Sequence, residues 1–548
     1  MFGYLNTINK FFTGIFHSKY VFWFTLLCAM IIKYTYYGIK YFPILDDNNI
    51  YGFLYNYYSS HDAFVKLATS RPIAYFFDCF IISRLWKQMW IVLVGIILLH
   101  WVCCILIYKL FKAINLRIGY FVVLFFALAP FGTEATYWIS ASSRLVIGLF
   151  FALLSMYIMT SCICNDGIKN NRKQTILYLL LFWILNLMSM GFYEQITFFT
   201  FLCPLFILIV LIKKIKHKII LIIPFINIFL FAAFYKYFSD VGQIASRGQF
   251  LDENYISHTK DVLRSIRHLV VNEQISMYQQ GIVRGFNLII KDGNWPILVL
   301  FAVIAIVLSI HCSFRLKVIN ENYTKSIKKI IIAVFLFIIP FAPFFVLKLI
   351  YITNRNAFVS LFAIGLVAEV LLYIILKWDK RRIVIGLISG VMVFLFLLTN
   401  TSELQDYRNV SEADQEIVNN LTEAYIQRSD NGKDGTLLFN TKDIYVDVTL
   451  KHFSNCTAAD WALTGAVQAL RSDAHLGVIQ PIKKNEKIIL PIVPIKKYAF
   501  YGIGDSKEVF HLNGTWNGDE LLLYKDDGSL FGIVIKDNNG SQIFKVIK

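Results

Sequence analysis

Adjacent carboxylates open the list of residues that could perform chemistry in this sequence. Asp46 and Asp47 follow the first long apolar run, in the segment Phe42-Pro-Ile-Leu-Asp-Asp. Neighbouring carboxylates repel each other, so at least one is expected to have a partner. One of them could act as the general base that removes a proton from an acceptor hydroxyl. The alternative is that both are solvated loop acids.

An arginine lies later in the same polar segment. Arg71 stands in Ser70-Arg-Pro. A guanidinium can hold a phosphate through two parallel hydrogen bonds, which the lysine ammonium cannot match. The alternatives are a membrane-surface anchor or a structural ion pair.

The segment 131–144 combines an acid, an arginine and two aromatic rings. Glu134, Tyr137, Trp138 and Arg144 lie where one apolar run ends and the next begins. This set suits a sugar-phosphate site, since aromatic rings stack on sugar faces and arginine binds phosphate. Tyrosine and tryptophan also gather at membrane interfaces for purely physical reasons, so the rings alone indicate little.

Glu194 interrupts a nearly continuous apolar region, 175–212. A carboxylate in such a region is costly unless it is paired or functional. Arg355 occupies the matching end of a later apolar run. Glu194 could pair with Arg355, or either could pair with Asp46 or Arg71.

The elements that must position these residues are membrane helices. The chain is 57% hydrophobic and only 16% charged, which an ordinary soluble protein of this length does not show. A membrane crossing needs roughly 20 mostly apolar residues. Eleven runs meet this length approximately, at 20–38, 88–108, 118–131, 144–163, 175–192, 196–212, 218–237, 295–313, 329–350, 357–376 and 383–399.

Charge predicts the orientation of these helices. Lysine and arginine gather in every second connecting segment, where Asp166, Glu321 and Asp379 are the only acids. The positive-inside rule therefore puts the N-terminus in the cytoplasm and the candidate residues outside. The net charge of +17 is thus a topology signal, and no nucleic-acid partner is expected.

Two domains are predicted. Residues 1–400 form a multi-helix membrane domain with outer loops 39–87, 131–144 and 239–294. Residues 401–548 form a small extracytoplasmic α+β or mainly β domain, with a helix at 402–428. Short alternating runs predict its strands at 436–439, 444–449, 487–492, 520–524, 532–536 and 542–547.

The sequence gives little sign of a bound cofactor. Histidines are scattered, and neither a Walker-type loop nor GxGxxG occurs, so direct use of cytosolic nucleotides is not expected. No transition-metal site is predicted. A divalent cation at Asp46 and Asp47 stays open.

The arrangement resembles the GT-C superfamily of membrane glycosyltransferases. The acidic pair Asp46-Asp47 in the first outer loop and Ser70-Arg-Pro resemble the segments of bacterial glucosyltransferase-like members. The resemblance covers the architecture of residues 20–400. It implies a sugar donor linked to polyprenyl phosphate, a cell-envelope glycan acceptor, and an inverting transfer at the outer face of the plasma membrane.

The resemblance also implies residue roles. Asp47 or Asp46 would activate the acceptor hydroxyl. Arg71, Arg144 or Arg355 would stabilise the departing lipid phosphate. By residue type and position alone, Glu134 is a further catalytic candidate, and Glu194, Tyr137 and Trp138 are expected to support the site. The C-terminal domain would hold or orient the acceptor.

Other functions fit parts of the sequence. A secondary transporter or a lipid-linked glycan flippase would show repeats and charges at mid-membrane, whereas most charges here lie at helix ends. A surface polysaccharide polymerase or ligase would use a large late loop, for which 239–294 qualifies. A non-enzymatic envelope scaffold is the remaining alternative.

Overall fold

The computed structural model divides the chain into two compact units, which are described separately. The first unit comprises Met1–Lys40, Lys66–Phe77 and Trp90–Leu404, and the second comprises Tyr41–Val65, Asp78–Met89 and Gln405–Lys548. The structure describes residues 18–52, 71–165, 168, 171–240, 255–315, 323–348, 350–376, 381–420, 436–440, 456, 460–471, 478–479, 482–484, 487–490, 499–503, 509–517, 520–525, 527–536 and 542–546.

The first unit is helical. Its principal helices are α2 (Lys19–Tyr34), α5 (Pro72–Phe77), α6 (Met89–Ala113), α7 (Tyr120–Leu128), α8 (Thr133–Tyr137), α9 (Ile139–Cys164), α11 (Arg172–Met190), α12 (Glu194–Val210), α13 (Ile223–Asp240), α14 (Tyr255–Arg267), α15 (Gln274–Lys291), α16 (Trp295–Arg315), α17 (Tyr323–Ile338), α18 (Asn354–Ala357), α19 (Leu361–Ile375) and the first part of α20 (Arg381–Asn420).

Within the described residues, eight helical segments are long and apolar enough to cross a membrane, or nine if a bent pair counts as one span. The chain is therefore a multi-pass membrane protein. Two further predicted runs are helical but shorter, since α2 has 16 residues and α12 has 17. The predicted number of eleven crossings stays a prediction.

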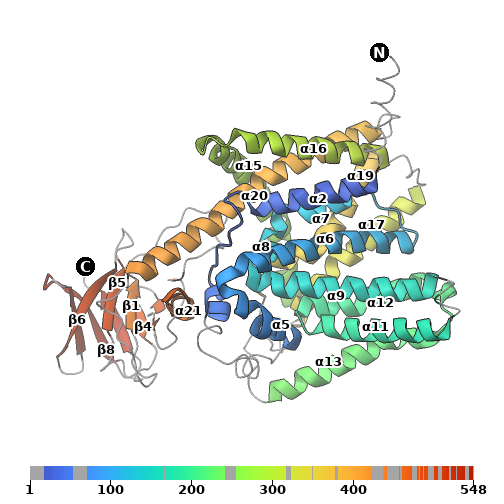
Figure 1. Cartoon of the computed structure of the whole chain (residues 1–548). Helices are drawn as coiled ribbons and strands as arrows, with labels where there is room; N and C mark the ends of the chain where they lie inside the picture. Colours follow the sequence, from blue (N-terminus) through green and yellow to red (C-terminus); the bar gives the residue numbers. More distant parts are fainter. Residues whose placement is uncertain are drawn as a thin grey trace, which may run out of the picture. The chain divides into compact units, whose positions relative to one another are not determined.

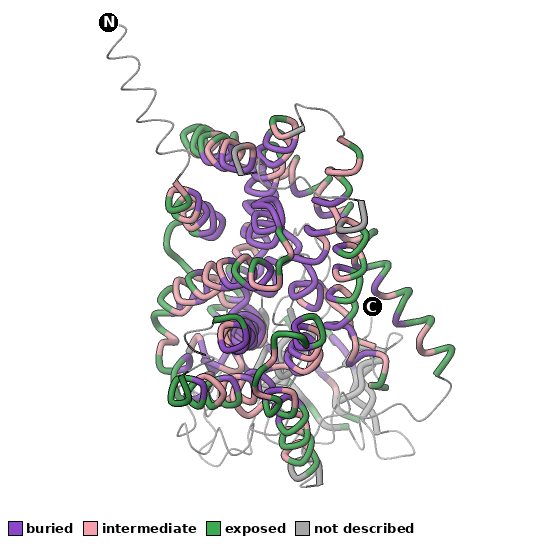
Figure 2. Tube along the Cα trace, turned by 90° about the vertical axis from the view of Figure 1, so that its right-hand side faces the viewer, coloured by how far each residue is buried: buried purple, intermediate pink, exposed green. Residues whose placement is uncertain are grey.

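Helices that are close in sequence pack against one another in this unit. Figure 1 shows α9, α11 and α12 lying side by side, and all three contact one another. Figure 2 colours the chain by burial, with buried residues gathered toward the inside of the helix bundle and many exposed residues along its outer helices. Exposed apolar side chains on α11 and α13 suit helices whose outer faces meet lipid.

The bent pair is the break between α7 and α8. The two segments Tyr120–Leu128 and Pro130–Tyr137 meet at 52°. Ala129 precedes Pro130 with a ψ of 124°, because the proline ring disfavours the helical region for the residue before it. Within the predicted run 118–131, helix α7 therefore ends just before Pro130.

A buried carboxylate caps the other end of α7. Both carboxylate oxygens of Glu369, on α19, accept from the Gly119 N–H, at 2.8 and 3.0 Å. A helix N-terminus has free N–H groups and a positive dipole end, which favours an anion there.

The second unit contains one nine-stranded sheet in the order β2-β1-β5-β6-β7-β8-β9-β4-β3. The strands are β1 (Thr436–Asn440), β2 (Val478–Ile479), β3 (Ile482–Lys484), β4 (Lys487–Leu490), β5 (Ala499–Ile503), β6 (Val509–Asn517), β7 (Glu520–Lys525), β8 (Leu530–Lys536) and β9 (Gln542–Val546). β1 pairs in parallel with β2 and β5, and the other pairs are antiparallel.

Most predicted strands coincide with these, and the predicted strand 444–449 lies outside the described residues. Helix α21 (Asp460–Arg471) and the short helices η1 (Asn48–Gly52), η2 (Asp78–Ile82) and η3 (Ser83–Gln88) complete the described helices of this unit, together with the end of α20.

The prediction that a helix starts at residue 402 is wrong, and residues 421–428 of that predicted helix lie outside the described residues. α20 is one continuous helix of 40 residues that passes through position 400. Hydropathy falls there, but no glycine or proline lies between 391 and 420, so nothing in the backbone ends the helix. The second unit also draws in segments 41–65 and 78–89, which the sequence analysis placed with the membrane domain.

Candidate functional site

Arg71 and Glu194 form a two-point ion pair in the first unit. Arg71 Nε donates to Oε1 at 3.0 Å and Nη2 donates to Oε2 at 2.9 Å. The side chains are 20% and 30% exposed. Burial lowers the pKa of Arg71, but the Glu194 carboxylate, Tyr193 and Tyr75 together raise it by more, so the pKa lies above its ordinary value. This is one of the pairs the sequence left open.

A tight backbone contact sets the position of Arg71. The Gly191 carbonyl, in the turn between α11 and α12, accepts from the N–H groups of Ile73 and Ala74 at 3.1 and 3.2 Å. A Cβ at Gly191 would lie 2.5 Å from Ile73 Cγ1. Only glycine lets the start of α5 approach this turn so closely. The same turn carries Glu194, so both partners of the pair are fixed together.

Aromatic rings and a second arginine surround this pair. The Arg71 guanidinium lies 4.3 Å from the centre of the Tyr193 ring. Arg144, on α9, lies 5.4 Å from the centre of the Tyr75 ring. Arg144 is close enough to Arg71 for their like charges to repel. The arrangement places two guanidinium groups near the Glu194 carboxylate, which suits an anionic ligand.

A second ion pair joins Glu134 on α8 to Arg355 on α18. Arg355 Nη1 lies 3.4 Å from Glu134 Oε1, and the Arg355 N–H donates to Oε2 at 3.3 Å. The side chains of Arg355 and Glu134 are only 14% and 5% exposed. The guanidinium also lies 5.0 Å from the Trp138 ring and 5.8 Å from the Tyr351 ring.

One hydrogen bond connects the elements that carry the two pairs. Gln195 Nε2 donates to the Asn356 carbonyl at 3.1 Å. Gln195 directly follows Glu194, and Asn356 directly follows Arg355. The two pairs therefore belong to one connected cluster, although the sequence did not indicate that Glu134 is the partner of Arg355.

The predicted aromatic pair is mostly buried. Tyr137 has no exposed surface and its ring centre lies 5.5 Å from that of Tyr34, so it packs behind the cluster and does not face solvent. Trp138 is 7% exposed. Within the described residues its buried Nε1 has no hydrogen-bond partner, so this donor could serve a ligand oxygen.

Asp46 and Asp47 belong to the second unit and differ in burial. Asp47 is fully buried, and its Oδ2 accepts from Tyr41 Oη and from the Ile44 N–H, the latter at 3.3 Å. Asp46 is half-buried. Leu45, directly before them, has a φ of 42°, which costs a non-glycine residue energy.

Sequence analysis missed two buried charged side chains. Lys33 on α2 and Glu403 on α20 are each 3% exposed, and they lie close enough for their opposite charges to attract. Lys33, a lysine inside the first apolar run, is the sequence feature that indicates a buried partner. Glu403 was not considered as that partner because the sequence places it in the exported domain. His100 is also buried, with its ring centre 5.0 and 5.3 Å from those of Phe126 and Phe358.

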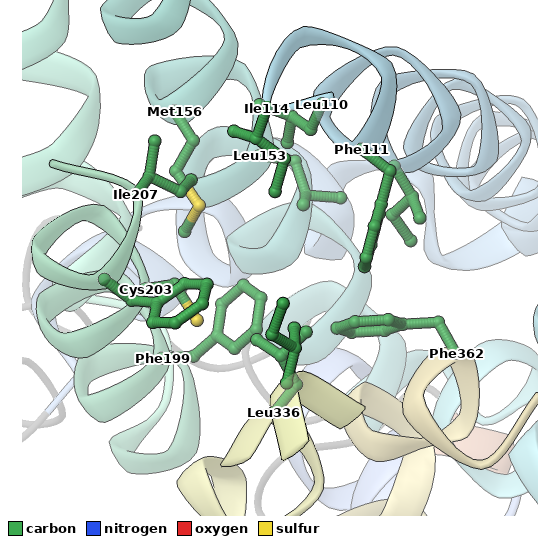
Figure 3. Close-up of a pocket in the computed structure, with 13 residues that line it drawn as sticks. Leu110, Phe111, Ile114, Leu153, Met156, Phe199, Cys203, Ile207, Leu336 and Phe362 are labelled. Atoms are coloured by element: carbon green, nitrogen blue, oxygen red, sulfur yellow. The ribbon is translucent and has the colours of Figure 1, made fainter. Parts of the chain in front are cut away.

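A cavity among the helices lies elsewhere and is wholly apolar. It measures about 50 Å³ and its lining includes Leu110, Met156, Phe199, Cys203 and Phe362. Figure 3 shows only carbon and sulfur atoms on these side chains. A dry cavity of this size has no polar group to fix a sugar or a phosphate, so it is not the candidate site. Among the described residues, no three or more histidine, cysteine or acidic side chains could hold a metal ion together.

Comparisons with known proteins give only distant structural matches. No family model matches the sequence, and no curated protein matches it. One match is a crystal structure of the Archaeoglobus fulgidus oligosaccharyltransferase in complex with Zn and sulfate. Its TM-score is 0.39 and its sequence identity is 11%, and the match covers 83% of this chain and 62% of that chain.

Two further matches have similar values. AglB of the same organism, in complex with an inhibitory peptide and a dolichol-phosphate, has a TM-score of 0.36 and 11% identity over 84% of this chain and 69% of that chain. ArnT of Cupriavidus metallidurans in the apo state has a TM-score of 0.36 and 10% identity over 84% of this chain and 85% of that chain. This chain spans about three fifths of the first oligosaccharyltransferase structure. Scores at this level assign neither a fold nor an activity, so functional assignment rests on the residues described above.

Proposed function

We propose that the chain is a membrane glycosyltransferase of the GT-C type that moves a sugar from a polyprenyl-phosphate donor to a cell-envelope acceptor on the outer face of the plasma membrane. The observation that carries this proposal is the two-point Arg71–Glu194 pair beside Arg144. It offers a partly exposed guanidinium, held in a fixed orientation, with a second guanidinium close to it.

The chemistry needs such a group. When the sugar leaves its lipid carrier, the bond between the anomeric carbon and the phosphate oxygen breaks and its electron pair stays on that oxygen. Fixed positive charge at this oxygen stabilises the transition state more than the ground state. Arg71 is the arginine that we assign to the phosphate, and Arg144 adds to the positive field.

The general base is assigned to Asp46. The two aspartates are adjacent, but Asp47 is buried and engaged by Tyr41 and Ile44, whereas Asp46 keeps accessible surface. A base must reach the acceptor hydroxyl to take its proton. Asp47 then orients the turn, and a single displacement by the activated hydroxyl inverts the anomeric centre.

Glu134 and Arg355 are given a supporting role. Their pair is almost closed to solvent, and the Arg355 guanidinium lies against the Trp138 ring. A carboxylate that is 5% exposed and already paired is poorly placed to exchange protons with a substrate. The pair instead keeps Trp138 and the start of α9 in place beside Arg144.

The loop expected for a polymerase gives less support to that alternative. Arg264 is 81% exposed and pairs with Asp261, three residues earlier on α14. His268 Nδ1 lies 3.3 Å from Glu273 Oε1 and is 63% exposed. These are local surface contacts, which contribute little energy.

The test is the envelope glycan composition of a deletion strain complemented with wild type, Asp46→Asn or Asp47→Asn. We expect the deletion to lose one sugar. Wild type should restore it, and Asp46→Asn should not, at normal membrane abundance. Asp47→Asn should reduce abundance as well as transfer, because it disturbs the buried turn.

Asp261→Asn is the matched control, since it removes an exposed acid from α14. It should restore the sugar fully. An unchanged glycan in the deletion strain would remove the glycosyltransferase assignment. Full activity of Asp46→Asn would remove only the assignment of the base.

A further inference from the structure

Helix α21 of the C-terminal sequence packs directly on the segment that follows Asp46 and Asp47. Both elements belong to the second unit. A Cβ added at Gly52 of η1 would lie 2.1 Å from the Ala469 Cβ, and one added at Gly465 would lie 2.6 Å from the Asn49 Cα. The two backbones therefore meet with no room for a further methyl group.

The contact is buried on both sides. On α21, Ala462 and Ala466 have no exposed surface, and Ala469 is 3% exposed. On the facing segment, Tyr51 has no exposed surface and its hydroxyl donates to Asp78 Oδ1 at 3.0 Å. Small side chains on one helix face let the backbones approach, while Tyr51 and Asp78 fix η1 from behind.

The segment held in this way is short and strained. Leu45 has a φ of 42°, a conformation that persists only where surrounding contacts maintain it. Asp46 follows immediately, and the Asn48 and Asn49 N–H groups both donate to the Leu45 carbonyl, at 3.1 and 3.3 Å. A shift of η1 is therefore transmitted to the turn within one or two residues.

We infer that α21 is a positioning element that sets the orientation of the Asp46 carboxylate through its close contact with η1. The inference rests on the proposed function of Asp46. It gives the C-terminal sequence a role inside the transfer reaction, beyond the acceptor binding expected from the sequence. Displacement of η1 should lower the rate of transfer without weakening donor binding, because the donor phosphate is assigned to other residues.

Two compensating substitutions test this contact, because a methyl group can be added on η1 and removed from the facing position on α21. Gly52→Ala adds a methyl group where the Ala469 Cβ already lies, and Ala469→Gly removes that Cβ. We expect Gly52→Ala to lower kcat on the order of 10-fold to 100-fold at unchanged donor KM, the usual result of a small misplacement. Ala469→Gly added to it should restore kcat. All variants are measured as purified full chains with a lipid-linked sugar donor, and their thermal unfolding is followed in parallel.

Leu523→Ala is the matched control. Leu523 is fully buried in β7, whose strand neighbours are β6 and β8. This variant should lower stability but leave kcat of the folded protein unchanged. If Gly52→Ala does not fold, Gly465→Ala takes its place, since its Cβ meets the Asn49 backbone, and folding of the Gly52→Ala/Ala469→Gly variant supports the contact directly.

Three results would overturn the inference: wild-type kcat in Gly52→Ala, a loss that Ala469→Gly does not restore, or an equal loss in Leu523→Ala. Failure of the proposed function looks different. In that case wild type transfers no sugar, while the unfolding temperatures of the Gly52 and Ala469 variants still report whether the contact exists.

Discussion

The two arginine–glutamate pairs consist of the same residue types but differ in their exposure to solvent. Arg71 and Glu194 are 20% and 30% exposed and meet through two hydrogen bonds of 3.0 and 2.9 Å. Arg355 and Glu134 are 14% and 5% exposed, and their side-chain nitrogen and oxygen are 3.4 Å apart. The more accessible pair has the better geometry.

This difference in exposure suggests different roles for the two pairs: ligand binding for the Arg71 pair and structural support for the Arg355 pair. Breaking a buried pair leaves a charge without compensation, whereas a partly exposed guanidinium can be rehydrated or can take another anion. Under the proposed function, we therefore expect the Arg71 pair to exchange its carboxylate contacts for a phosphate during a reaction cycle. The Arg355 pair is expected to stay intact and to contribute to stability.

The largest expected effect is on transfer by Arg71 variants. Arg71→Gln should lower kcat by about 100-fold to 1,000-fold, the usual loss when one fixed group that stabilises developing negative charge is removed. Arg71→Lys keeps the charge but loses the two-point fork, so it should retain intermediate activity. Initial rates with a lipid-linked donor measure both.

Arg264→Gln is the control for that series, because Arg264 is 81% exposed on α14. It should match wild type. Equal rates for Arg71→Gln and wild type would show that Arg71 has only a structural role, and the contrast between the two pairs would fail.

The second effect concerns stability. Glu134→Gln should lower the free energy of unfolding by about 3 kcal/mol, because it leaves the buried Arg355 without its carboxylate. Glu194→Gln should cost no more than about 1 kcal/mol, since its partner reaches solvent. Thermal and denaturant unfolding of the purified protein in detergent measure the difference.

Removing both members of the buried pair tests the cause. Arg355→Gln combined with Glu134→Gln should recover most of the lost stability, because no uncompensated charge remains. A double variant that is as unstable as Glu134→Gln would show that the loss comes from packing. Equal losses for Glu134→Gln and Glu194→Gln would contradict the comparison.

Much of this cluster could be predicted from sequence, although its pairing could not. The cost of an acid in an apolar region predicted that Glu194 needs a partner. Three partners remained open, because the choice depends on how α5 docks on the Gly191 turn. That docking is a backbone contact, which leaves no pattern in hydropathy.

Other parts of the fold show where hydropathy is informative. Helix α7 ends before Pro130 because proline acts locally on the backbone, whatever the hydropathy of the run. The change in hydropathy near residue 400 did not end α20, because hydropathy reports the surroundings of a helix and not its continuity. The burial of Tyr137 and the association of segments 41–65 and 78–89 with the C-terminal unit likewise depend on tertiary packing.

The smallest effect tests that docking directly. Gly191→Ala places a Cβ 2.5 Å from Ile73 Cγ1, so the start of α5 must shift and carry Arg71 with it. We expect kcat to fall on the order of tenfold, with little change in the unfolding temperature. Ile73→Ala removes the opposing Cγ1 and should restore part of the rate when combined with Gly191→Ala. If Ile73→Ala does not restore the rate, the effect of Gly191→Ala comes from a changed turn conformation and not from the contact with Ile73. The ion pair with Glu194 would then be what positions Arg71.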